Sequence, residues 1–160
     1  MKFLNVNMEV KNIPELDKEY IPFSKFMDAF LKTATKPISV AIERNDGLVY
    51  RYDTFIHETE EMYEADKCYI ERLVKFLLWA KGGYRIYIGG NNKIGNFIKN
   101  EYSKTGKRVF DNNFMEKVYE KDFEVIVTTI ENIPEAKENP EAVGRHLDGC
   151  RIGFDAGRKW

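Results

Sequence analysis

The residues whose types and spacing could do chemistry lie at the C-terminal end of this sequence. The run Arg151-Ile152-Gly153-Phe154-Asp155-Ala156-Gly157 has the pattern of a short strand with an aspartate at its end and a glycine two residues later. Glycine lets the backbone come close to a ligand, and backbone amides can cradle the oxygens of an anionic group. Such a run can bring backbone amides close to an anionic ligand.

This run resembles the first phosphate-binding segment of the ROK family of sugar kinases and repressors, which share the fold of actin, Hsp70 and hexokinase. The resemblance implies that Asp155 and Gly157 are cofactor-binding residues, with the aspartate near magnesium and the glycine beside the nucleotide phosphates. The family pattern continues with a second glycine, a small hydroxyl residue and a lysine, whereas Arg158-Lys159-Trp160 follows here. The family's catalytic, sugar-binding and zinc-binding residues would lie downstream, so no catalytic or metal-ligating residue is predicted in this chain.

The stretch from Gly144 to Gly149 resembles the junction in longer ROK-like proteins that carry an extension before the kinase portion. The resemblance then implies the non-catalytic N-terminal portion of a ROK-like sugar kinase or related ATP-dependent phosphotransferase. We expect no cofactor bound by this chain alone, and Mg-ATP bound by the full-length protein. The alternatives are a self-contained α/β binding or interaction module, and a small enzyme that uses the crevice beyond Ile88 and Val127.

A second pattern with phosphate-binding potential is Gly89-Gly90, between a predicted strand and a predicted helix. Helix N-termini attract anions. The pair lacks both the Gly-Lys-Ser/Thr ending of a P-loop and the three-glycine dinucleotide fingerprint, and a tight strand-to-helix turn uses the same residues. The turn is the favoured interpretation.

The histidines and cysteines form no convincing site. His57 and Glu61 would share a helix face only if the helix began early, and no second histidine follows at ligand spacing, so a zinc site is disfavoured. Cys68 lies within a predicted buried helix and His146 lies in the junction. A catalytic Cys-His pair is one alternative that the sequence allows, but a packed thiol and a surface imidazole are the favoured interpretations.

Composition limits the partners. With 25 basic and 26 acidic residues the net charge is −1, so the basic and aromatic residues between Lys99 and Phe110 are more typical of a solvated helix end than of a nucleic-acid site. No long apolar stretch predicts a membrane span, and two cysteines without an apolar leader favour a reduced, cytoplasmic protein. The expected partner is the kinase portion or another subunit, with a homo-oligomer left open.

The elements that must position these residues follow from periodicity. Apolar residues at helical spacing predict a helix over 22–34 that begins at a proline. Alternating apolar residues predict strands over 38–42 and 48–56, joined at Asn45-Asp46-Gly47 as a hairpin. Residues 1–20 combine alternation with Pro14 and predict an extended arm or an edge strand.

The strongest helix prediction covers residues 59–81, whose wide apolar face, counting Phe76, predicts a mostly buried helix. Strands over 84–88 and 123–127, with helical patterns near 94–102 and 111–120 between them, predict a βαβ unit.

The predicted fold class is thus α/β. It comprises a mixed sheet with a β-hairpin, a long buried helix and a βαβ unit, and the chain ends in a strand resembling the first strand of an actin-like ATPase domain. We expect an α/β domain over 1–130, a linker or long surface loop over 131–148, and the incomplete start of the ROK-like part over 149–160.

Overall fold

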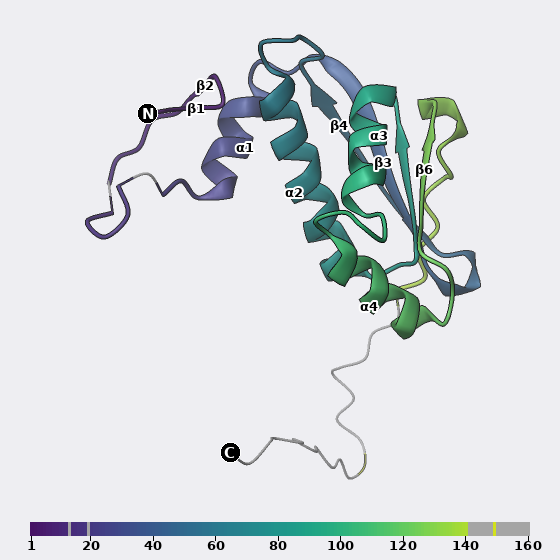
Figure 1. The fold of residues 1–160 in the computed structure, drawn as a ribbon. Helices are drawn as coiled ribbons and strands as arrows, with labels where there is room; N and C mark the ends of the chain where they lie inside the picture. The colour runs from purple at the N-terminus through teal and green to yellow at the C-terminus, as the bar shows by residue number, and fades with distance from the viewer. Residues whose placement is uncertain (13, 19, 141–148, 150–160) are drawn as a thin grey trace.

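The computed structural model describes residues 1–12, 14–18, 20–140 and 149. Its centre is a four-stranded sheet in the order β4-β3-β5-β6, covered on one face by helices (Figure 1). The strands are β3 (Lys36–Glu43), β4 (Val49–Ile56), β5 (Arg85–Gly89) and β6 (Glu124–Thr128). The sheet is mixed, and the predicted α/β class is confirmed.

The predicted hairpin of β3 and β4 is present and closes in a tight turn. Pairing extends from Lys36 opposite Ile56 to Glu43 opposite Val49. Asp46 and Gly47 adopt φ angles of 61° and 64°, in the left-handed region that Asp and Gly tolerate best.

The predicted βαβ unit is also present. Strand β5 pairs in parallel with β6, and Ile88 lies opposite Val127. Helices α3 (Asn92–Glu101) and α4 (Val109–Tyr119) connect the two strands. Strand β3 pairs antiparallel with the other edge of β5, so the hairpin and the βαβ unit share one sheet.

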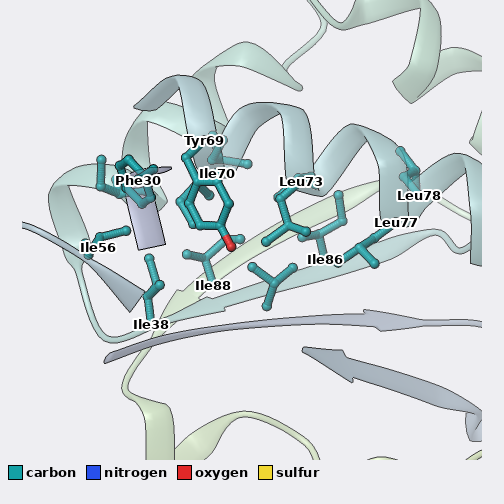
Figure 2. Packing of buried hydrophobic residues seen from close by; sticks show 14 of the residues in the cluster. Phe30, Ile38, Ile56, Tyr69, Ile70, Leu73, Leu77, Leu78, Ile86 and Ile88 are labelled. Carbon is teal, nitrogen blue, oxygen red and sulfur yellow. The ribbon is translucent and has the colours of Figure 1, made fainter. Parts of the chain in front are cut away.

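Helix α2 (Tyr63–Lys81) supplies most of the core from the helical layer, as Figure 2 shows. Leu73, Leu77 and Tyr69 lie over Ile86 and Ile88 of β5. The helix begins four residues later than the predicted residue 59. Glu58 adopts a φ of 59°, which a right-handed helix cannot include, and turns follow until Met62.

Phe76 and Ala80, both counted in the predicted buried face, are on the surface. Phe76 is 66% exposed, whereas its neighbour Leu77 is 3% exposed. Successive residues on a helix lie about 100° apart, so a side chain next to a core position can point away from the sheet. The prediction that Phe76 belongs to the core is wrong.

The N-terminal segment forms a small sheet of its own, in which β1 (Lys2–Phe3) pairs antiparallel with β2 (Val6–Asn7). Val6 is buried against the core beside α1 (Phe23–Leu31), whose inward residues include Phe26. In its described part this segment is an arm and not an edge strand of the main sheet.

The second face of the main sheet is partly covered by residues that follow β6. A short 3-10 turn, η2 (Ile130–Asn132), leads to Ile133, which packs with Ala41 and Val49. Lys137 then exchanges two backbone hydrogen bonds with Val49, at 2.8 and 2.9 Å. The described part of the stretch predicted to be a linker therefore lies against the sheet as far as residue 137. No helix within the described residues is long and apolar enough to cross a membrane.

Candidate functional site

The predicted cofactor-binding residues Asp155 and Gly157 lie outside the described residues, as do His146 and Cys150. The structure does place Gly89, Gly90 and His57, which lie at the same end of the sheet. Gly89 ends β5, and His57 directly follows β4. Since β4 and β5 both end there, the loops that follow them face one crevice.

The crevice lies beyond the carboxyl ends of β5 and β6, where open α/β sheets commonly bind ligands. It has a volume of about 690 Å³. Its walls come from the loop before α2, the start of α3 and the residues after β6, and include Glu58, Tyr63, Asn91, Thr128 and Glu131. This is the crevice beyond Ile88 and Val127 that the third interpretation of the sequence requires.

Most polar groups at the mouth of the crevice are already paired. Asn91 caps α3 by accepting the backbone N–H of Ile94 at 2.9 Å, and its amide donates to Glu58 at 2.9 Å. Lys93 lies 2.8 Å from Glu60. The hydrogen bond that Lys93 donates to the Glu60 carboxylate raises the pKa of Lys93, so the lysine stays charged and paired. The start of α3 is therefore capped by the protein's own side chain, which supports the turn interpretation of Gly89-Gly90.

Glycine at position 90 allows both a backbone conformation and a close backbone contact that a residue with a side chain would disfavour. Its φ is 112°, which residues with a side chain rarely adopt. A Cβ atom built at Gly90 would lie 2.7 Å from the carbonyl oxygen of Pro37 at the start of β3. A glycine here lets the turn after β5 lie against β3.

Beside the crevice, three side chains form a hydrogen-bonded row. The Oγ1 of Thr33 lies 2.8 Å from Nε2 of His57, whose Nδ1 lies 3.1 Å from Oδ1 of Asp66. Asp66 is 1% exposed and also accepts the backbone N–H groups of His57 and Glu58, at 3.0 and 2.9 Å. A carboxylate only accepts hydrogen bonds, so Asp66 favours the tautomer with the proton on Nδ1 and a free electron pair on Nε2.

The row has the order hydroxyl, imidazole, carboxylate found in nucleophilic hydrolases. Such sites also need N–H donors aimed at the developing oxyanion. The backbone N–H groups of Thr33 and Ala34 both donate to Phe30, and that of Thr35 donates to Ile56. The row thus links the end of α1 to the loop before α2. The backbone N–H groups of Thr33, Ala34 and Thr35 already donate to backbone carbonyls, so they are not available to an oxyanion.

Both ring nitrogens of His57 are used within this row, and Glu61 is not among its partners. Among the described residues, no group of three or more His, Cys, Asp or Glu side chains could hold a metal ion. Cys68 is half-buried, and burial raises the pKa of its thiol, so the reactive thiolate is disfavoured.

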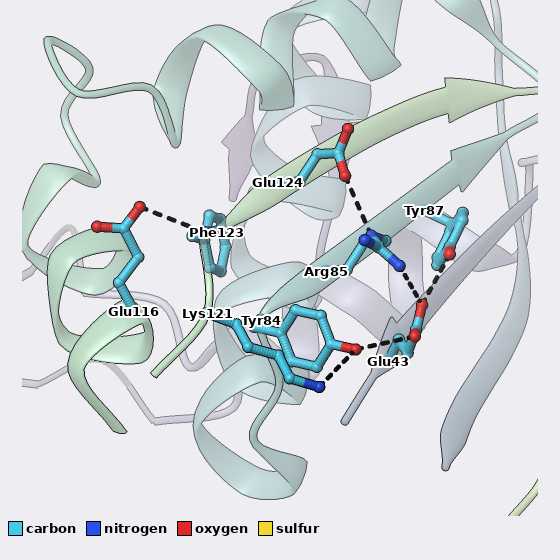
Figure 3. A network of polar contacts seen from close by, with 8 residues as sticks. All are labelled: Glu43, Tyr84, Arg85, Tyr87, Glu116, Lys121, Phe123 and Glu124. Atoms are coloured by element: carbon cyan, nitrogen blue, oxygen red, sulfur yellow. Dashed lines mark hydrogen bonds and ion pairs between the residues drawn. The ribbon is translucent and has the colours of Figure 1, made fainter. Parts of the chain in front are cut away.

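A second polar cluster lies at the opposite end of the sheet and centres on Glu43 (Figure 3). The Glu43 carboxylate accepts hydrogen bonds from the hydroxyls of Tyr84 and Tyr87, at 3.0 and 2.8 Å, and from Arg85 at 3.0 Å. Arg85 also pairs with Glu124 across the β5–β6 ladder at 3.1 Å. The members of this cluster are donors and acceptors for one another.

The cluster shifts the ionisation of its members. Burial opposes ionisation of Glu43, but its three donors outweigh that effect and hold its pKa below the ordinary value. Burial, together with the Glu43 carboxylate, raises the pKa of Tyr87. The carboxylate and the neutral phenol are both stabilised, so the cluster serves to join β3 to β5 and β6.

The sequence offered little signal for either cluster. Thr33, His57 and Asp66 come from the end of α1, the end of β4 and the first turn of α2, and they meet only because β4 returns the chain beside α1. The one readable signal was an aspartate near the start of a predicted helix, nine residues after a histidine that follows a predicted strand.

No protein-family model, curated protein or solved structure matches this chain.

Proposed function

We propose that this chain is the non-catalytic N-terminal portion of a ROK-like sugar kinase or a related ATP-dependent phosphotransferase. The observation that carries the proposal is the run from Arg151 to Gly157, in which Asp155 ends an apolar stretch and Gly157 follows it. Glycine at that spacing lets backbone amides approach phosphate oxygens. Asp155 and Gly157 are the proposed cofactor-binding residues.

The end of the described α/β body supports this division of roles. Ile133 fills the space beside Ala41 and Val49, and Lys137 pairs with Val49. Glu138 then pairs with Arg44 at 3.0 Å and with Lys81 at 3.4 Å. The chain is thus tied to its own sheet and to α2 shortly before the ROK-like run begins, as expected of an extension that folds ahead of the kinase portion.

Phosphoryl transfer needs a γ-phosphate, a metal ion, a residue that orients the nucleophile, and donors where charge develops. In the proposed whole protein Mg-ATP supplies the phosphoryl group, and Asp155 and Gly157 contribute one wall of its site. The α/β body is proposed to pack on or regulate the kinase portion.

Calorimetric titration of the purified 160-residue chain with Mg-ATP, beside a coupled kinase assay over hexoses and N-acetylhexosamines, tests the proposal. We expect no micromolar binding and no turnover from this chain, and both from the full-length protein. Asp155→Ala in the full-length protein should abolish ATP binding. Micromolar ATP binding by the 160-residue chain would contradict the incomplete site, whether or not Asp155→Ala removed it.

The second candidate is a small enzyme that uses the crevice beyond β5 and β6, and the presence of that crevice favours it. Binding there would depend on its wall, and Thr128→Val would remove a hydroxyl at its edge. ATP binding by the 160-residue chain that survives Asp155→Ala but falls in Thr128→Val would favour this candidate over the first.

A further inference from the structure

A second cavity lies between the N-terminal segment and α1, at the opposite end of the Thr33–His57–Asp66 row from the crevice. Thr33 and His57 form part of its wall, whereas Asp66 lines the crevice. After β2 the chain loops away from α1 and returns to it at Phe23, as Figure 1 shows. The cavity is enclosed by this N-terminal arm and one side of α1, and has a volume of about 1260 Å³. We call it the arm cavity.

The floor of the arm cavity is apolar and rich in methionine. Val6 and Met8 are 4% and 5% exposed and belong to the core. Three of the chain's five methionines line the cavity, namely Met1, Met8 and Met62. The ammonium of Met1 donates to the carbonyl of Met8 at 2.8 Å, which holds this part of the wall in place. Methionine is unbranched and flexible, so this floor can adapt to an apolar chain.

The rim of the arm cavity carries an excess of positive charge. Four lysines line it, two from the arm and two from α1: Lys2, Lys11, Lys25 and Lys32. None of the four makes an ion pair or a hydrogen bond with the described residues. The carboxylates on the same walls are Glu9 and Asp28. Four lysines against two carboxylates leave an excess of two positive charges in a chain whose net charge is −1.

The two walls that enclose the arm cavity therefore carry charge of the same sign. Lysines on the arm and lysines on α1 repel one another, whereas an anionic group between them attracts both sets. The apolar floor favours a ligand that also carries a hydrocarbon body. The charge and the floor together define an amphipathic anion as the complementary ligand.

We propose that the arm cavity binds a long-chain carboxylate. Its carboxylate pairs with Lys25 and Lys32, which lie on the same face of α1. Its hydrocarbon chain lies on Val6, Met8 and Met62. The ligand contacts both the arm and α1, so its binding holds the arm against the helix. The proposal concerns the described α/β body alone and does not rest on the proposed function.

Calorimetric titration of the purified 160-residue chain with sodium octanoate, decanoate and dodecanoate, at low salt, tests the class of ligand. We expect one molecule bound per chain. The affinity should rise by up to about fourfold for each added methylene, because each is transferred from water to the apolar floor. Dodecyltrimethylammonium has the same chain with a cationic head and is the control. It should bind more weakly than dodecanoate, because its head is repelled by the lysines.

Methyl NMR of the chain labelled with ¹³C at its methionine methyl groups locates the bound dodecanoate. The resonances of Met8 and Met62 should shift during the titration, because both side chains line the arm cavity. Met115 is the internal reference, since it is 4% exposed in the core and does not line the cavity, and its resonance should stay in place.

A double variant, Lys25→Gln with Lys32→Gln, tests the role of the lysines. Both residues are exposed, so the fold should persist. The affinity for dodecanoate should fall about fivefold or more, because two ion pairs with the carboxylate are lost. Lys99→Gln with Lys117→Gln is the control of equal charge, since both lysines are exposed on α3 and α4 and neither lines the cavity. This control should bind dodecanoate as the parent does.

Four results would overturn the proposal. The first is no detectable binding of dodecanoate, and the second is equally tight binding of dodecyltrimethylammonium, which would show that the charge of the head is not read. The third is binding that leaves the resonances of Met8 and Met62 unchanged, which would place dodecanoate elsewhere on the protein. The fourth is an equal loss of affinity in the two double variants, which would mean that only the overall charge of the chain matters.

Discussion

Asp66 accepts hydrogen bonds from both the backbone N–H and the imidazole ring of His57. The same carboxylate oxygen accepts the backbone N–H of His57 at 3.0 Å and lies 3.1 Å from the ring Nδ1. The second oxygen accepts the N–H of Glu58, whose φ of 59° bends the chain into the loop before α2. One buried carboxylate thus fixes both the turn after β4 and the tautomer of the histidine.

Asp66→Asn should lower the free energy of unfolding by about 1–3 kcal/mol. The Asn side chain would place its NH₂ group, which is a donor, opposite one of the backbone N–H groups that Asp66 accepts, so that N–H would lose its acceptor. Urea unfolding measures the change. Glu64→Gln is the control, since Glu64 lies in the same first turn with its side chain 64% exposed, and we expect a change within about 0.5 kcal/mol. Equal effects of the two substitutions would contradict the role given to Asp66.

Leu77→Ala should cost about 2–5 kcal/mol, the range for a large-to-small change in a core. Leu77 is 3% exposed on the face of α2 that lies over the sheet. Phe76→Ala on the same helix removes a larger but exposed side chain, and should cost no more than about 1 kcal/mol. A chemical denaturation midpoint unchanged by Leu77→Ala would show that this face of α2 is not in the core.

Glu43→Gln should destabilise the protein in a pH-dependent way. The folded protein holds the pKa of Glu43 below its ordinary value of 4.5, so its carboxylate stabilises the fold above that pH. This contribution is lost as the pH falls through the folded pKa. The variant should therefore be less stable than the parent by about 1–3 kcal/mol near neutral pH, with a smaller difference in acid.

Unfolding midpoints in urea, measured from neutral pH to about pH 3, test this dependence. Glu124→Gln is the control, because Glu124 also pairs with Arg85 but its side chain is 54% exposed, and exposed pairs contribute about 0–1 kcal/mol. A difference between Glu43→Gln and the parent that stays constant over this range would contradict a carboxylate role for Glu43.

Two buried tyrosines should respond oppositely to loss of their hydroxyl. The hydroxyl of Tyr69 lies 2.6 Å from Oγ1 of Thr54, whereas that of Tyr102 is buried without a hydrogen-bond partner among the described residues. Tyr69→Phe should cost about 1–2 kcal/mol, and Tyr102→Phe should be neutral or stabilising, because it removes an unsatisfied polar group. Thermal unfolding of both variants would refute this contrast if Tyr102→Phe were the more damaging.

The sequence predicted the elements well where side-chain periodicity is local. The hairpin around Asn45-Asp46-Gly47 and the parallel pairing of β5 with β6 followed from alternation, turn residues and the helical patterns between the strands. The start of α2 was placed too early, because the acidic residues before it fit the first turn of a helix, whereas residues 59–62 form turns. The predicted phosphate-binding residues Asp155 and Gly157 stay a prediction.

The sequence by itself determined the α/β class and the order of helices and strands, because these depend on the spacing of apolar residues and on Gly and Pro within short windows. The tertiary structure decided which distant residues meet. The insertion of β3 between β4 and β5 brings Glu43 to Arg85, and the packing of α4 beside α2 brings Trp79 to Asp111. Such contacts depend on strand order and helix packing, which no local pattern encodes. For the same reason, only the structure separated buried Leu77 from exposed Phe76.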